Sequence, residues 1–274
     1  MHPTLWVPFL GPVAAAPAMV IVGAATGLVV GVRVGSWMEG IDPRALWLPA
    51  LAGLLGALAG GRLHFVLNNP QFFAHDWWSV LRPAGAMHIP GAVVGGLIGV
   101  AATVPLTTVP FARQLDAFVP AITIGFVLAR VGCFLQGCCF GTVCHHPWCM
   151  SFPPPSIVYR VHAAEGWIPP GAPGSLPVHP TQLYFLAIVV LAGVAAQIVR
   201  RRTGIEGHAA WTGLVVLGIG SAAVEPLRAG QAAPLVFWLG RSQLWWSALA
   251  LAGLGTAGFV VSSLRRRNVS PRPT

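Results

Sequence analysis

PVAAAPAMVIVGAATGLVVGV, residues 12–32, is a run of 21 residues without a charged side chain. A helix needs about 20 apolar residues to cross the hydrocarbon core of a bilayer, so this run is long enough for one crossing. Six further apolar runs approach that length, at residues 46–67, 91–110, 115–132, 182–199, 209–226 and 243–264. The pattern predicts an all-α polytopic membrane protein with about seven transmembrane helices.

The composition agrees with this fold class. The chain is 55% hydrophobic and 8% charged, with a mean hydropathy of +0.71, whereas roughly 25% of the residues in a soluble domain are charged. Lipid is therefore expected to solvate most of the surface. The N-terminal stretch MHPTLWVPFLGP has no basic segment, so a cleavable signal peptide is not expected.

The distribution of arginine predicts the orientation, because the chain contains no lysine. Short loops on the cytoplasmic side of a membrane carry an excess of basic residues. With seven spans and the N-terminus outside, the inner connections and the C-terminal tail hold Arg33, Arg44, Arg113, Arg200, Arg201, Arg202, Arg265, Arg266, Arg267 and Arg272. The net charge of +9 is therefore read as a topology signal and as contact with anionic lipid headgroups. Nucleic acid is not an expected partner, because the basic residues form no stripe interleaved with aromatic residues.

We expect a single membrane domain over residues 1–264 and a basic cytoplasmic tail over residues 265–274. A large outer loop is expected at about residues 133–178, because its segments SFPPPS and GWIPPGAPG are too rich in Pro and Gly for a long helix. A helix is predicted to restart at HPTQLYF, with His179 at the N-cap, Pro180 at the first helical position and Gln182 in the first turn.

Five cysteines, the only ones in the chain, lie in the single stretch RVGCFLQGCCFGTVCHHPWC: Cys133, Cys138, Cys139, Cys144 and Cys149. Three interpretations remain open. An oxidising outer compartment allows disulfides, which leave one thiol over because the count is odd. Five thiols with His145 and His146 could also hold zinc or copper, although no other cofactor is expected. The third possibility is a catalytic or acyl-carrying thiol at Cys133 or Cys138, activated by Arg130 and a nearby histidine.

Six sequence blocks, in order along the chain, resemble those of the prolipoprotein diacylglyceryl transferase family. They are FLGPVAAAPAMVIVGA, GGRLHFVLNN, PGAVVGGLIG, RVGCFLQGCCFG, the pair PWCMSFPP and HPTQLYF, and VEPLR. The resemblance implies a seven-span enzyme of the bacterial inner membrane. Such enzymes transfer a diacylglyceryl group from phosphatidylglycerol to the lipobox cysteine of a lipoprotein precursor, and glycerol phosphate leaves. Expected partners are phosphatidylglycerol, a lipoprotein precursor or another thiol acceptor, and membrane lipids.

The resemblance also implies site residues. Arg130 matches the signature arginine and is expected to bind the phospholipid headgroup, because a guanidinium suits bidentate phosphate contact. Glu225 is a possible counter-ion for Arg130 or Arg62 and, with His88, a catalytic candidate. The remaining expected substrate-binding residues are Arg62, Gly141, His179, Gln182 and Arg228. The alternative for Arg62, Arg82 and Arg228 is that they reach the membrane interface without contacting substrate.

This chain departs from the family pattern at several positions. Pro90 precedes Gly91 and Ala92 where the family has His before Gly-Gly, although His88 lies two residues earlier. The other positions that differ are Ala18, Cys133, Cys138, Leu217 and Ser221. Two hypotheses follow. The first, which we favour, is a diverged diacylglyceryl transferase; the second is a non-transferase relative that uses the cysteine stretch for metal binding or thiol redox exchange.

Overall fold

The computed structural model describes residues 4–7, 11–70, 73, 76–81, 87–229 and 242–269. Arg82, a predicted interface residue, lies outside this range. Within it, seven helices are long and apolar enough to cross a membrane, which confirms the predicted all-α multi-pass membrane architecture. They are built on α1 (Ala15–Glu39), α2 (Pro43–Asn68), α3 (Ile89–Ala102), α4 (Phe111–Gln136), α6 (Thr181–Thr203), α7 (His208–Val224) and α8 (Gln243–Val269). The third and sixth spans include the 3-10 turn that follows the helix and run over Ile89–Leu106 and His208–Leu227.

The shorter elements lie at the helix ends. An antiparallel hairpin of β1 (Thr4–Val7) and β2 (Gly11–Ala14), which we did not predict, precedes α1. The 3-10 turns are η2 (Trp77–Leu81), η3 (Val104–Leu106) and η4 (Glu225–Leu227), and the short helix α5 (Ile157–Ala164) lies in the loop between α4 and α6. That loop therefore contains no long helix, as its Pro and Gly content predicts.

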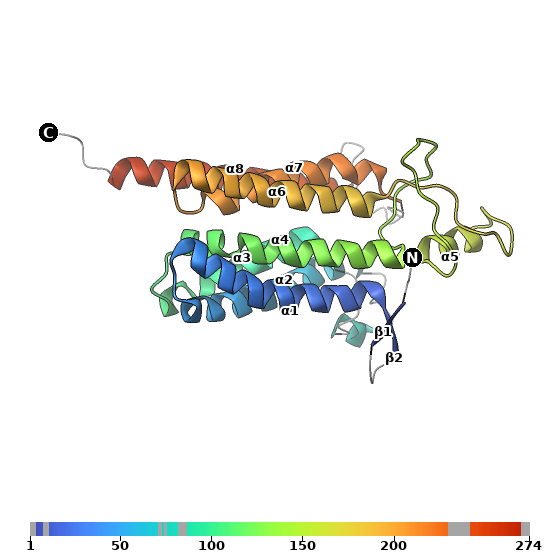
Figure 1. Cartoon of the computed structure of the whole chain (residues 1–274), viewed down its shortest axis with the longest axis horizontal. Helices are drawn as coiled ribbons and strands as arrows, with labels where there is room; N and C mark the ends of the chain where they lie inside the picture. The colour runs from blue at the N-terminus through green and yellow to red at the C-terminus, as the bar shows by residue number, and fades with distance from the viewer. Residues whose placement is uncertain are drawn as a thin grey trace.

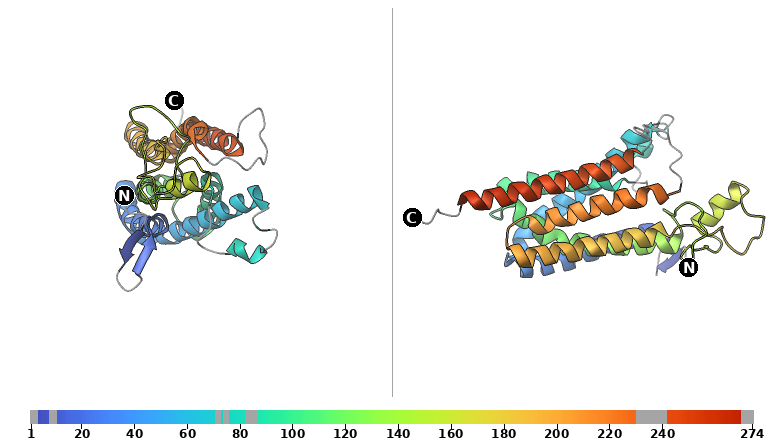
Figure 2. Two further views of the ribbon diagram at one scale, coloured as in Figure 1. Left: turned by 90° about the vertical axis from the view of Figure 1, so that its right-hand side faces the viewer. Right: turned by 90° about the horizontal axis from the view of Figure 1, so that it is seen from above.

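The spanning helices run side by side along the long axis of the molecule (Figure 1). Helices α6, α7 and α8 form one layer and α1 to α4 the other, and the end-on view in Figure 2 agrees. Helix α4 is central, because it packs against α1, α6 and α7. We call the end that carries α5 and the hairpin the loop end, and the end where α6 passes into α7 the arginine end.

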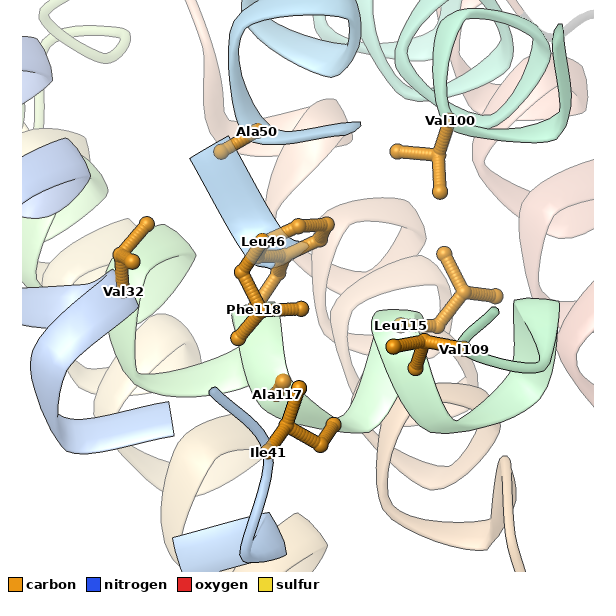
Figure 3. Packing of buried hydrophobic residues seen from close by; sticks show 9 residues of the cluster. All are labelled: Val32, Ile41, Leu46, Ala50, Val100, Val109, Leu115, Ala117 and Phe118. Carbon is orange, nitrogen blue, oxygen red and sulfur yellow. The ribbon is translucent and has the colours of Figure 1, made fainter. Parts of the chain in front are cut away.

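The outer surfaces of the spanning helices are apolar. Ile21, Leu55, Ile98 and Leu191 are each more than 60% exposed. Exposed apolar side chains on every layer are what lipid solvation requires. Inside the bundle, side chains of α1 to α4 and their connections form one buried cluster near the arginine end (Figure 3): Val32, Ile41, Leu46, Ala50, Val100, Val109, Leu115, Ala117 and Phe118.

Small residues let α2 and α3 pack closely. A Cβ atom at Gly95 would lie 2.1 Å from the carbonyl oxygen of Gly56, and one at Gly60 would lie 2.3 Å from that of Gly91. Close packing across small residues is the common mode of helix association in membranes. The glycines of the third-span block therefore set the spacing of this helix pair.

Two predicted helix boundaries were wrong. Helix α4 begins at Phe111 and ends at Gln136, beyond both ends of the predicted run 115–132. Its first turn is polar but has partners, because Arg113 donates to the Glu39 carbonyl and Gln114 Nε2 donates to the Val109 carbonyl. Helix α6 begins at Thr181 and has Pro180 at its N-cap, without a side-chain cap. His179 is therefore not the N-cap residue.

Candidate functional site

The segment RVGCFLQGCCFG, residues 130–141, is called the signature below. It contains the last turns of α4 and the turn that follows the helix. Gly137, with a φ of 69°, caps the helix, and the chain then turns through Cys138 and Cys139. The first turn of α6 holds this turn: Thr181 Oγ1 donates to the Cys139 carbonyl at 2.5 Å, and Gln182 Nε2 donates to the Cys138 carbonyl at 2.7 Å. Gln182, a predicted substrate-binding residue, thus positions the signature backbone.

Gly141 joins three segments by their backbones. Its N–H donates to the His179 carbonyl at 2.9 Å, and it forms an isolated antiparallel bridge with Arg228. A Cβ atom at Gly141 would lie 2.5 Å from the Leu227 carbonyl oxygen and 2.6 Å from the His179 Cβ. No larger residue fits without a backbone shift, so Gly141 brings the VEPLR block against the signature.

Two guanidinium groups face one aromatic ring as a result. The Arg130 Cζ lies 4.7 Å from the centroid of the Phe185 ring, and the Arg228 Cζ lies 5.9 Å from it. Cation–π contacts of this kind hold a guanidinium plane while leaving its edge N–H groups available. The arginines come from the end of α4 and the end of η4, which are about one hundred residues apart in sequence.

These arginines have unused donors. Within the described residues, the Arg130 guanidinium makes no hydrogen bond or ion pair, and the buried Nε of Arg228 has no hydrogen-bond partner. Arg228 Nη1 pairs with Glu225 Oε2 at 3.3 Å. The predicted pair between Glu225 and Arg130 is therefore not formed; Glu225 pairs with the arginine one 3-10 turn further along instead.

His88 lies at the N-cap of α3, beside a second histidine. Its Nδ1 is 3.2 Å from the Nδ1 of His64 on α2. Burial lowers the pKa of His88 to about 4, and positive charge on His64 and Arg228 acts in the same direction. Burial thus favours the neutral form of His88, which lies at the loop end of the bundle, the end that also carries Arg130 and Arg228.

His64 is a site residue that sequence reasoning missed. It lies two residues after the predicted Arg62, near the end of a transmembrane run, where an imidazole is expensive and usually functional. That signal was present in GGRLHFVLNN. Its contact with His88 depends on the α2–α3 glycine packing, since a Cβ atom at Gly91 would lie 2.3 Å from the His64 Cβ.

Arg62 binds the backbone of a neighbouring turn. Its Nε donates to the Val80 carbonyl at 2.9 Å and its Nη2 donates to the Ser79 carbonyl at 2.6 Å. The guanidinium also lies over the Phe65 and Phe73 rings. These contacts hold η2 against the end of α2, so Arg62 supports the structure at this end of the bundle.

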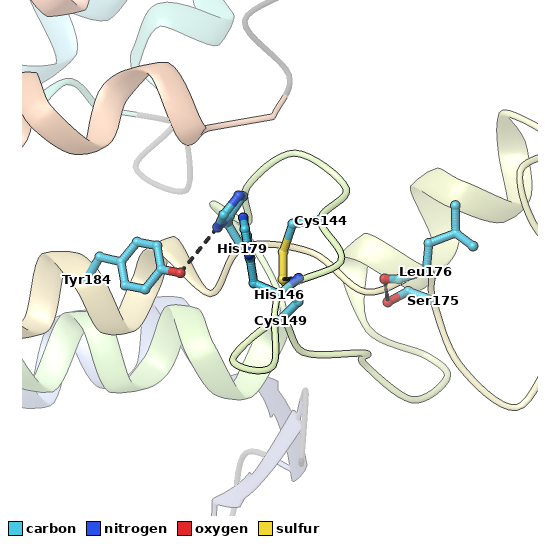
Figure 4. Close-up of a disulfide and its surroundings, with 7 residues drawn as sticks. All are labelled: Cys144, His146, Cys149, Ser175, Leu176, His179 and Tyr184. Carbon is cyan, nitrogen blue, oxygen red and sulfur yellow. Dashed lines mark hydrogen bonds between the residues drawn. A yellow bond between two sulfur atoms is a disulfide. The ribbon is translucent and has the colours of Figure 1, made fainter.

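The five cysteines separate into a pair and a trio. Cys144 and Cys149 form a disulfide in the loop (Figure 4). Beside it, His146 stacks on Trp148 with ring centroids 4.7 Å apart, and His179 Nδ1 lies 3.2 Å from the Tyr184 hydroxyl. While this disulfide is closed, Cys144 and Cys149 offer no thiolate to the predicted metal site, because a disulfide sulfur is not a thiolate ligand.

Cys133, Cys138 and Cys139 remain free, and their sulfur atoms lie within 4.8 Å of one another. Hydrogen bonds from the Cys133 and Cys138 thiols hold the pKa of Cys139 well below its ordinary value, and the charges of Arg130 and Arg228 lower it further. Hydrogen bonds with Cys133 and Cys139 raise the pKa of Cys138. The trio lies near both arginines in the chain path, because Arg130 is one helical turn before Cys133 and Gly141, two residues after Cys139, bridges to Arg228.

An apolar cavity of about 130 Å³ lies within the bundle, between α3, α4, α6 and α7. Its walls are almost entirely carbon and include Leu97, Phe126, Val189, Trp211 and Leu217. Leu217 stands where the family pattern has a tyrosine. A cavity of this composition suits hydrocarbon.

The family model described as "Prolipoprotein diacylglyceryl transferase" matches residues 14–261. Three similar proteins carry the name "Phosphatidylglycerol--prolipoprotein diacylglyceryl transferase". The protein from Clostridium tetani is 26% identical over 65% of this chain and 66% of its own length. That from Methylococcus capsulatus is 32% identical over 61% and 57%, and that from Neisseria meningitidis is 26% identical over 84% and 82%. The chain thus spans less than two thirds of the length of the first two relatives.

Proposed function

The chain belongs to the prolipoprotein diacylglyceryl transferase family, and from this premise we propose that it transfers a diacylglyceryl group from phosphatidylglycerol to a thiol. The proposed acceptor is the lipobox cysteine of a lipoprotein precursor. The proposed location is the bacterial inner membrane, with the loop end on the outer side. Arg200, Arg201 and Arg202 at the opposite end support this orientation.

The observation that carries the proposal is the convergence of Arg130 and Arg228 on the Phe185 ring. A phosphodiester needs cationic donors in a fixed arrangement, and arginine supplies paired N–H groups for it. Since Arg130 has no anionic partner among the described residues and the Arg228 Nε is unpaired, both have donors for one phosphate. We assign the headgroup phosphate of the lipid to this position.

The reaction needs a nucleophilic sulfur and an acceptor for its proton. The sulfur attacks the glycerol carbon that carries the phosphate, the carbon–oxygen bond breaks, and glycerol phosphate leaves with the bonding electrons. We assign the proton to His88: if its Nδ1–H donates to His64, its Nε2 lone pair is free to accept. A phosphate on Arg228 would offset one of the charges that lower the pKa of His88.

His88 would thus replace the family histidine whose place Pro90 takes. The arginines bind the leaving phosphate and stabilise the charge that grows on it as the bond breaks. The apolar cavity inside the bundle offers space for hydrocarbon of the diacylglyceryl group. Phosphate donors at one end and an apolar interior below them match the two parts of a phospholipid.

The test is a transfer assay with the full chain in detergent, phosphatidylglycerol and a synthetic lipobox peptide, read by mass spectrometry. The peptide is expected to gain the mass of a diacylglyceryl group with the wild-type protein. Arg130→Ala should abolish this gain. Arg160→Ala is the matched control, because Arg160 is an exposed residue of α5 on the same end of the bundle.

Two results would contradict the proposal. One is the absence of any mass gain when a known transferase is active in the same mixture. The other is an equal loss of activity in the Arg130→Ala and Arg160→Ala proteins, which would mean that general positive charge, not the paired guanidiniums, supports the reaction.

A further inference from the structure

Three free thiols meet at the end of α4. Cys133 lies in the last turn of the helix, and Cys138 and Cys139 follow its capping glycine. The backbone N–H of Cys138 donates to the Cys133 carbonyl at 3.1 Å, which folds the chain back over the helix end. All three sulfur atoms lie within 4.8 Å of one another.

The protein holds this arrangement against a backbone preference. Cys139 has a φ of 55°, in the left-handed region that residues with a Cβ atom rarely adopt. The hydrogen bonds of Thr181 and Gln182 to the carbonyls of Cys139 and Cys138 fix the turn. Strained backbone that neighbouring segments hold in place is characteristic of functional sites. Two adjacent cysteines are thus kept in a turn that directs both sulfurs toward Cys133.

The chemistry of the cluster favours a soft metal ion. Three sulfur ligands at this spacing match thiophilic ions, of which copper(I) and zinc are the common ones. Zinc in structural sites takes four ligands, whereas within the described part of the chain no fourth Cys, His, Asp or Glu joins the trio. Copper(I) accepts three thiolates in a trigonal arrangement. We propose that Cys133, Cys138 and Cys139 bind one copper(I) ion.

The surroundings balance the charge of such a complex. Three thiolates and one monovalent ion carry a net negative charge, which is costly to bury without cations nearby. The guanidiniums of Arg130 and Arg228 lie at this end of the bundle, against Phe185, and Gly141, two residues after Cys139, forms a backbone bridge with Arg228. Cys144 and Cys149, which pair with each other in the loop, lie outside the site and serve as the reference cysteines.

The test uses the full chain in detergent, reduced without added thiols and titrated anaerobically with copper(I) against a coloured copper(I) chelator. One ion per chain is expected to bind. Copper bound to the wild-type protein should protect the thiols of Cys133, Cys138 and Cys139 from alkylation, as measured by peptide mass spectrometry. This readout needs no variant, so it does not depend on whether a substituted protein folds.

Variants then assign the ligands. Cys133→Ser, Cys138→Ser and Cys139→Ser should each weaken copper(I) binding by more than about tenfold, while the double variant Cys144→Ser/Cys149→Ser keeps the wild-type affinity. Zinc should bind much more weakly than copper(I).

The proposal is overturned if the fully reduced protein binds no ion, if copper leaves the three thiols open to alkylation, or if two of them are disulfide-bonded in the protein as purified. The copper(I) titration contains no phosphatidylglycerol, so a negative result leaves the transferase proposal unaffected. A negative transfer assay likewise leaves the copper(I) proposal unaffected.

Discussion

The charged side chains at the two ends of the bundle differ in their bonding partners. At the arginine end, Glu39 forms ion pairs with Arg113 and Arg200, and Asp116 accepts hydrogen bonds from two backbone N–H groups. At the loop end, the Arg130 guanidinium lies against the Phe185 ring and makes no hydrogen bond or ion pair among the described residues, and the Arg228 Nε has no hydrogen-bond partner there. Charges inside a membrane protein are expensive unless they are paired. Among the described residues, the buried charges of the arginine end therefore have partners within the protein, whereas the loop end keeps guanidinium donors without one.

Arginine substitutions at the two ends should have opposite effects. Arg130→Ala is expected to lower the transfer rate by about 100- to 1,000-fold, because it removes a donor that stabilises the leaving phosphate, with little change in stability. Arg200→Ala should instead lower the stability, because it leaves Glu39 without its closest ion pair, and leave the rate per folded molecule unchanged. Transfer assays and thermal unfolding in detergent measure the two quantities. If Arg130→Ala destabilises the protein as much as Arg200→Ala does, the contrast between the ends disappears.

The carboxylate of Asp116 tests the arginine end alone. Asp116→Ala should lower the free energy of unfolding by about 3 kcal/mol, because two backbone N–H groups at the start of α7 lose a charged acceptor in a buried position. Denaturant unfolding in detergent gives the value. Asp42→Ala is the matched control, since Asp42 caps α2 through one bond at an exposed position and should cost about 1 kcal/mol or less. Equal costs would show that burial of Asp116 adds nothing.

Much of the fold could be predicted from the sequence, because apolar length alone identifies a spanning helix. The ends of α4 could not, since its charged residues are tolerated only through Glu39 and the start of α7, which are distant in sequence. The individual residues Arg130, Arg228 and His88 were also predictable from resemblance. Their positions relative to one another were not predictable, because these depend on the close contact at Gly141 and on the glycine packing of α2 and α3.

The cysteines show a further limit of sequence reasoning. Their number and spacing allowed disulfides, metal binding or a reactive thiol. Only the fold separates Cys144 and Cys149, which close on each other in the loop, from the three that gather at the end of α4. The spacing of four residues is the same on both sides of the Cys138–Cys139 pair, so the sequence pattern alone could not distinguish them.

The smallest expected effect concerns pH at the loop end. The pKa of His88 is about 4 in the folded protein, below its ordinary value of 6.5, so between these values the unfolded chain binds more protons than the folded one. Stability should therefore be fully present above about pH 6.5 and decline as the pH falls toward 4. Unfolding temperatures measured across this range should fall less in His88→Gln than in the wild type. If the unfolding temperatures of both proteins fall in parallel, a group other than His88 causes the acid sensitivity. The loop end would then resemble the arginine end in keeping its contacts at low pH.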